Sequence, residues 1–135
     1  ESCTGGGVAR AITEISGSSA WFDRGFITYS NAAKHEMLGV LLQTLECEGA
    51  VSEATVREMA EGALAKSRAQ ISLAVSGIAG PRGGIIEKPV GTVCFAWCAT
   101  GRPTIVTTEH YSGDRAAIQQ QAVLHALRGV LRARS

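Results

Sequence analysis

Hydroxyl groups, glycines and charges that could bind a ligand are gathered in one long loop, residues 76–92. The loop contains Ser76, Arg82, Glu87 and Lys88, together with five glycines and two prolines. Glycine lets a backbone adopt positive φ values and approach a ligand closely. Connections of this length inside a domain are usually functional or disordered, and strand-like sequences flank this one at 71–75 and 92–98. The pattern predicts a binding site at the end of the first of these strands.

A second group of hydroxyls and glycines opens the chain, where residues 1–7 are Glu-Ser-Cys-Thr-Gly-Gly-Gly. Val8, Ile12 and Ile15 follow at spacings typical of one face of a helix. The first N–H groups of a helix lack partners within it and lie at the positive end of its dipole, so they can bind an anion. Such a start can equally be an ordinary helix cap, and both interpretations stay open.

Composition limits the classes of protein to which the chain can belong. Its 135 residues are 45% hydrophobic with a net charge of +1, which predicts one domain with a real core and no basic surface for nucleic acid. No apolar run approaches the ~18 residues of a membrane span. Cys3, Cys47, Cys94 and Cys98 form no C-x-x-C pair and have no histidine at ligand spacing. We therefore expect no zinc site and reduced thiols in a cytoplasmic protein, and we expect no cofactor.

Strand and helix signals alternate along the chain. Apolar periodicity and capping residues predict helices at 8–15, at 32–38, from Ser52 onward and after Asp114. A further helical turn is one interpretation of 41–47. Strands are predicted at 25–29, 71–75, 92–99 and 104–111, the last two as a hairpin across 100–103. The 71–75 run is apolar on nearly both faces, as in the middle of a sheet covered by helices. Together these predict a three-layer α/β/α sandwich with a mixed, mostly parallel sheet.

Several sequence blocks together resemble the CinA C-terminal domain family. They occur in family order over nearly the whole chain: ESCTGG at 1–6, GSSA at 17–20, TYSNAAK at 28–34, GAVSE at 49–53, SGIAGP at 76–81, EKPVGTV at 87–93 and GDR at 113–115. The family domain normally begins with a helix and a strand before the first block. The resemblance therefore implies that residues 1–135 are a single domain without those two elements.

Stand-alone members of that family deamidate nicotinamide mononucleotide. The resemblance implies hydrolysis of its carboxamide to nicotinate mononucleotide and ammonia without a metal, in a homodimer. Position by position, Ser19 matches the proposed nucleophile, Lys34 the general base and Tyr29 an assisting hydroxyl. The expected substrate-binding residues are Ser2, Thr4, Gly5, Gly6, Ser76, Gly77, Gly80 and Arg115, and we expect Arg115, with groups near Thr4 and Ser76, to hold the phosphate.

The implied chemistry places physical demands on these residues. A lysine can take the proton of an attacking serine only if its pKa falls well below ~10.4. Lys34 is predicted in the first turn of a short helix, where the positive dipole end disfavours an ammonium ion, and N–H groups of a glycine-rich loop could form an oxyanion hole. Without the resemblance, Ser19 is an ordinary turn residue and Lys34 an ordinary solvated one.

Two departures and one alternative accompany the resemblance. Arg82 stands where the family commonly has Asp, and Ile85 and Ile86 replace a polar pair, so the substrate contacts of the long loop are in question. The alternative function is a non-catalytic nucleotide-binding or interaction domain, because family members also occur fused to a separate N-terminal domain and are linked by name to competence and DNA damage. The presence of both Ser19 and Lys34 favours the enzyme.

Overall fold

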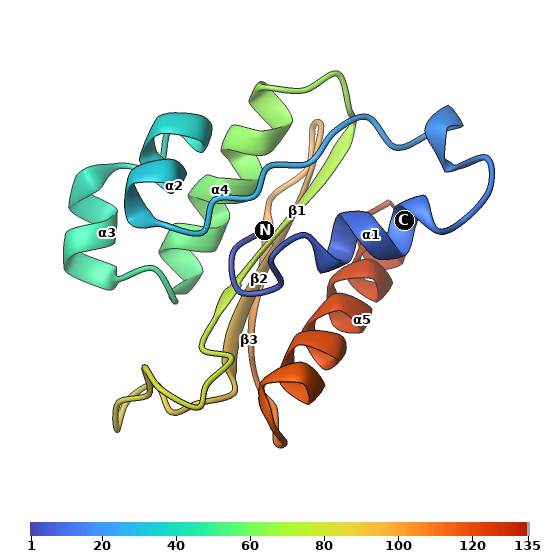
Figure 1. Cartoon of the computed structure of the whole chain (residues 1–135). Coiled ribbons are helices and arrows are strands. Elements are labelled where there is room, and N and C mark those ends of the chain that lie inside the picture. The colour runs from blue at the N-terminus through green and yellow to red at the C-terminus, as the bar shows by residue number, and fades with distance from the viewer. Residues whose placement is uncertain (135) are drawn as a thin grey trace.

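The computed structural model describes residues 1–134, in which a three-stranded sheet lies between helices (Figure 1). The strands are β1 (Ile71–Gly77), β2 (Thr92–Ala99) and β3 (Ile105–His110), and β2 is central. Both strand pairings are antiparallel, so the α/β class is confirmed but the prediction of a mostly parallel sheet is wrong. Parallel neighbours need a crossover connection, usually a helix, whereas β1, β2 and β3 follow one another through a loop and a tight turn.

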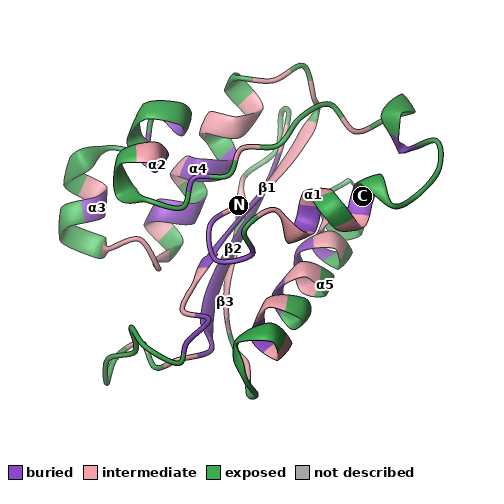
Figure 2. Ribbon diagram, viewed as in Figure 1, coloured by how far each residue is buried: buried purple, intermediate pink, exposed green. Residues whose placement is uncertain are grey.

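Helices cover both faces of the sheet, because each strand sends alternate side chains to opposite sides. Ala74, Cys94 and Ala96 pack with the helices α2 (Asn31–Leu38), α3 (Leu42–Glu48) and α4 (Glu53–Ala65). Val75, Phe95 and Trp97 pack on the other face with α1 (Gly7–Thr13) and α5 (Arg115–Ala133). The buried residues accordingly concentrate along β2 and on the helix surfaces that face it (Figure 2).

Capping side chains fix where three of the helices begin. Ser30, Ser52 and Asp114 each accept a hydrogen bond from the backbone N–H three residues later, at the starts of α2, α4 and α5. Gly39, at φ 73°, ends α2 in the left-handed region. These boundaries confirm the predictions made from capping residues. The ambiguous 41–47 segment forms α3, which has seven residues.

Two strand predictions need correction. Residues 25–29 are extended but form no strand; they are held by bonds from Glu1 N to Phe26 O and from Thr28 N to Glu1 O, each 2.8 Å. β1 lies at an edge of the three-stranded sheet instead of its middle. Apolar residues on both faces of a strand report that helices cover those faces, and they carry no information about neighbours in the plane of the sheet.

The remaining expectations concern thiols and membranes. All four cysteines are free, and only Cys47 is exposed. Within the described residues, no helix has both the length and the apolar character needed to cross a bilayer.

Candidate active site

The centre of the candidate site is a buried lysine that contacts a serine far away in sequence. Lys34 is 1% exposed, and its Nζ lies 2.9 Å from Ser2 Oγ. The same Nζ donates to the carbonyl oxygen of Thr28 at 2.8 Å. No carboxylate among the described residues forms an ion pair with Lys34. Lys34 therefore meets only neutral oxygens, which is unusual for a buried ammonium ion.

This environment favours the neutral amine. Burial lowers the pKa of Lys34 from its ordinary value of 10.5, with a smaller opposing effect from Cys3. Lys34 also lies in the first turn of α2, where the helix dipole acts in the same direction. A neutral amine can donate one proton to Thr28 and still offer a lone pair to the Ser2 hydroxyl. The pair therefore has the geometry of a base next to a nucleophile.

The carboxylate of Glu1 holds the turn that carries Ser2. Its oxygens accept from Thr4 Oγ1 at 2.6 Å and from the backbone N–H groups of Gly6, Val8 and Ala9 at 3.2, 2.9 and 2.9 Å. Ser2 N donates to Val75 O of β1 at 3.0 Å. The Ser2 backbone is thus fixed between α1 and the sheet. Glu1 itself occupies the anion-binding start of α1.

Ser2 and Lys34 line a pocket of about 310 Å³, which is called the Lys34 pocket below. This volume lies within the ~300–1,000 Å³ typical of small-molecule sites. One wall is the end of β1 and the start of the long loop, including Ser76, which is 1% exposed, and Gly77. Tyr29 and Arg115 complete it, with Asn31, Cys3, Ala50, Val51, Ile78, Ala79, Gly80, Arg82 and Gly83.

Arg115 ties the first residues of the long loop to the opposite wall. Its Nη1 donates to Gly80 O at 2.6 Å and its Nη2 to Tyr29 Oη at 3.1 Å. Gly80 has φ 81°, and a Cβ there would lie 2.5 Å from a Val90 methyl group. Both the backbone conformation and the space require glycine at this position. The pocket wall is therefore set by Gly80 and Arg115 together.

The described residues that line the Lys34 pocket include three basic side chains and no carboxylate. The bases are Lys34, Arg82 and Arg115, and the thiol of Cys3 is neutral because burial raises its pKa to about 11. An anionic ligand fits such a lining better than a cationic one. A larger cavity of about 750 Å³ lies elsewhere, between α1, β1 and the segment 21–26. Its lining is mostly aliphatic, and neither Ser2 nor Lys34 reaches it.

Comparison with known proteins agrees with the sequence blocks. The model of the CinA C-terminal domain matches residues 1–133. The chain belongs to the CinA C-terminal domain family. The nicotinamide-nucleotide amidohydrolase PncC of Enterobacter agglomerans is 57% identical over 132 residues, which are 98% of this chain and 80% of that protein. The protein of the same name from Escherichia coli K12 is 58% identical over 127 residues, 94% of this chain and 77% of that protein.

A solved structure has the same fold. The competence/damage inducible protein CihA from Agrobacterium tumefaciens superposes with a TM-score of 0.97 at 48% identity, over 99% of this chain and 82% of that one. The CinA domain fold and the sequence family are therefore assigned by independent comparisons.

The structure brings together seven of the eleven residues expected from the CinA resemblance. Those that line the Lys34 pocket are Ser2, Tyr29, Lys34, Ser76, Gly77, Gly80 and Arg115. Thr4 and Gly6 donate to Glu1 instead, and Gly5 is exposed. Ser19 is exposed in the short turn Ser18–Ala20, beyond the end of α1 and far from α2 (Figure 1). Within one chain, Ser19 and Lys34 are therefore not in contact.

Sequence reasoning missed two features of this CinA domain site: the contact between Ser2 and Lys34, and the role of Glu1. Arg82, a charged residue of the loop that was predicted to form a binding site, does line the pocket. The contact joins residues 32 positions apart, and no local periodicity reports such a pairing. The acceptor role of Glu1 had a visible signal, because an acidic residue shortly before a glycine-rich helix start can accept from its N–H groups.

Proposed function

We propose that this chain hydrolyses the carboxamide of nicotinamide mononucleotide, giving nicotinate mononucleotide and ammonia. Membership of the family and the names of the PncC relatives support this function. The observation that carries it is the contact between the buried Lys34 amine and Ser2 Oγ. A primary amide is inert near neutral pH, so its hydrolysis needs an activated nucleophile of this kind.

In the mechanism we propose, Ser2 Oγ attacks the carboxamide carbon while its proton passes to Lys34 Nζ. Backbone N–H groups of Gly77, Ala79 and Gly80, residues that line the same pocket, are our proposed donors to the tetrahedral oxyanion. Collapse breaks the C–N bond, and the Lys34 ammonium gives its proton to the departing nitrogen, which leaves as ammonia. Lys34 then takes a proton from water, which attacks the Ser2 ester. The Lys34 ammonium gives this proton to Ser2 Oγ as the ester bond breaks, and the acid product leaves and loses its own proton to water.

Ser2 is the nucleophile we favour over Ser19 because it already contacts the base. Ser19 remains a second candidate, and it would have to reach Lys34 from another copy of the chain. Tyr29 lines the pocket, where its hydroxyl accepts from Arg115, and it stays our proposed assisting hydroxyl. The two candidate nucleophiles lead to opposite expectations for the activity of Ser2→Ala and Ser19→Ala.

The test is ammonia release from nicotinamide mononucleotide by Ser2→Ala, Lys34→Ala, the double variant and Ser19→Ala. We expect the first two each to lose at least about 10³-fold in kcat. The double variant should lose no more than either, because nucleophile and base act as a unit. Ser19→Ala should stay close to wild type and serves as the matched control. Loss of activity in Ser19→Ala with retention in Ser2→Ala would reverse the assignment.

A binding measurement separates the enzyme from the non-catalytic alternative. Ser2→Ala should still bind nicotinamide mononucleotide in a calorimetric titration, because the hydroxyl is small and the pocket wall remains. Wild-type protein that binds the mononucleotide but releases no ammonia would favour a nucleotide-binding domain.

A further inference from the structure

One cation in the Lys34 pocket has no partner within the described residues. Lys34 donates to Thr28, and the Arg115 guanidinium donates to Gly80 and Tyr29. Arg82 lines the same pocket, is exposed, and makes no hydrogen bond or ion pair with another residue of 1–134. Its guanidinium therefore keeps all its donors available for a ligand.

The backbone that carries Arg82 is nevertheless fixed. Arg115 holds the carbonyl of Gly80, two residues earlier. Reciprocal backbone bonds between Ile85 and Lys88 close the far part of the loop, and Lys88 Nζ donates to Glu48 O at the end of α3. Arg82 is thus an exposed side chain without a hydrogen bond to another described residue, on an anchored backbone, at the mouth of a pocket whose buried end holds Ser2 and Lys34.

The charge of this lining suits one particular ligand group. A guanidinium presents paired donors that match the oxygens of a phosphate, and it stays protonated at any physiological pH. Within the described lining no carboxylate competes for it. A mononucleotide with its amide against Ser2 and Lys34 has its phosphate monoester at its other end. At the exposed mouth of the Lys34 pocket, this phosphate dianion would lie next to the guanidinium of Arg82, which is unpaired within the described residues.

We propose that Arg82 binds the phosphate monoester of the substrate and makes this chain selective for the mononucleotide over the nucleoside. The inference rests on the proposed function and adds a specificity-determining residue to it. Arg115 then acts as a positioning residue that fixes the wall from which Arg82 extends.

The experiment compares Arg82→Ala, Arg82→Lys and the control Arg57→Ala, which removes an exposed arginine of α4 outside the pocket. The substrates are nicotinamide mononucleotide and nicotinamide riboside, which lacks the phosphate. We expect Arg82→Ala to raise KM for the mononucleotide about tenfold, in line with a charge-assisted hydrogen bond weakened by solvent. Its kcat should stay unchanged, and so should kcat/KM for the riboside. Arg82→Lys should be intermediate, because it keeps the charge and loses the paired donors.

Two outcomes would overturn the proposal. One is an Arg82→Ala variant with wild-type KM for the mononucleotide, and the other is an equal loss for both substrates. Titration of the same proteins with nicotinamide mononucleotide gives a second measurement that does not need turnover. If wild type binds but does not hydrolyse, a weaker Kd in Arg82→Ala still supports the role of Arg82 while the proposed function fails. If wild type does not bind the mononucleotide, both fail.

Discussion

At the scale of single residues, the chemistry depends on how the fold treats one lysine. An exposed lysine is an ammonium ion and cannot accept a proton, whereas Lys34 is buried against two neutral oxygens. Burial disfavours the charged form because the ammonium loses its hydration. The buried location of Lys34 therefore favours the neutral amine, which is the form that the proposed mechanism needs as a base.

This leads to a prediction for the pH dependence of activity. The pKa of Lys34 is lowered, chiefly by burial, so the active neutral amine forms as pH rises through this lowered value. We expect kcat/KM to rise with pH and to level off below 10.5, the ordinary lysine value. Lys34→Arg should abolish the activity and with it the rise of kcat/KM with pH, because a guanidinium does not lose its proton. Rate profiles measured with ammonia detection would contradict the prediction if activity fell with pH over that range.

The lowered pKa of Lys34 also makes the stability of the protein depend on pH. A lowered pKa means that the unfolded chain binds more protons than the folded one between the lowered value and 10.5. Stability contributed through Lys34 therefore increases as pH rises across that window, and the cost of the buried ammonium is fully present below it.

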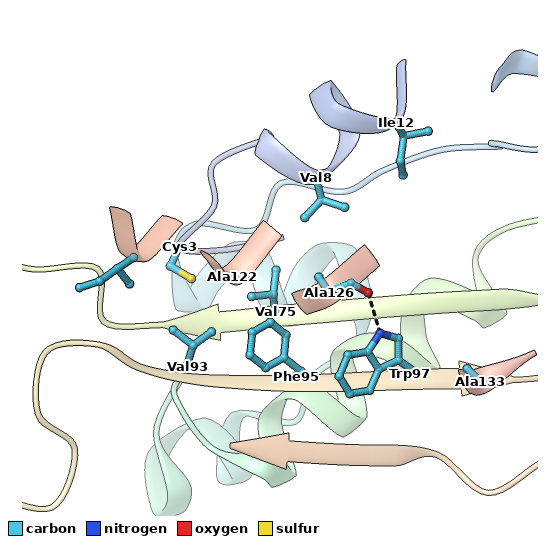
Figure 3. Packing of buried hydrophobic residues seen from close by; sticks show 11 residues of the cluster. Cys3, Val8, Ile12, Val75, Val93, Phe95, Trp97, Ala122, Ala126 and Ala133 are labelled. Atoms are coloured by element: carbon cyan, nitrogen blue, oxygen red, sulfur yellow. Dashed lines mark hydrogen bonds between the residues drawn. The ribbon is translucent and has the colours of Figure 1, made fainter. Parts of the chain in front are cut away.

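Among the helices and strands, α5 contributes to the pocket through its first residue and packs on the sheet through its later turns. Its first residue, Arg115, holds the loop and Tyr29 at the pocket. Further along, α5 packs closely on β2, where Trp97 Nε1 donates to Ala126 O at 2.8 Å (Figure 3). The indole also lies against Gly129, where an added Cβ would overlap the ring. Close packing at Gly129 thus sets the distance between the helix and the sheet.

Gly129→Ala should therefore destabilise the protein even though alanine is the better helix former. The overlap with Trp97 costs ~1–3 kcal/mol, against a helix-propensity gain of ~1 kcal/mol. We expect a lower midpoint in urea, with circular dichroism as the readout. Gln120→Ala, at an exposed position of the same helix, is the control and should be neutral or slightly stabilising. A more stable Gly129→Ala would show that α5 can shift away from β2 without cost.

At the level of the whole molecule, the Lys34 pocket is assembled from residues far apart in the sequence. Five separate stretches meet there: the N-terminal turn, the start of α2, residues 50–51 between α3 and α4, the end of β1 with its loop, and the first residue of α5. We propose a homodimer in which each copy holds a complete pocket. The resemblance to the CinA family supports this proposal.

Mixing variants tests this arrangement. Ser2→Ala and Lys34→Ala chains, unfolded together and refolded, should recover no ammonia release, because no pocket then holds both residues. Wild type mixed with Lys34→Ala should retain activity in proportion to its wild-type chains. Sedimentation equilibrium should find a dimer. Recovery in the first mixture would mean that the pair acts across copies, and a monomer would refute the homodimer.

The sequence by itself determined most of the elements and the family. Ser30, Ser52 and Asp114 begin helices because their side chains cap the next N–H groups, and capping is a local interaction. The hairpin of β2 and β3 was also predictable, because the turn between residues 99 and 105 depends on residues that are neighbours in the sequence. The blocks that resemble the family are also local, and seven residues taken from them meet in one pocket.

Only the tertiary structure decided which residues face one another. Ser2 and Lys34 become partners because Ser2 N is bonded to β1 while Thr28, shortly before α2, is bonded to Glu1 O. The antiparallel direction of the strands also depends on the tertiary structure. Apolar faces of a strand indicate that it is buried, but they do not indicate which strand lies beside it or in which direction that strand runs. Lys34 differs from an exposed lysine through burial alone. Its pKa is therefore a property of the folded chain, because only the completed core removes water from its amine.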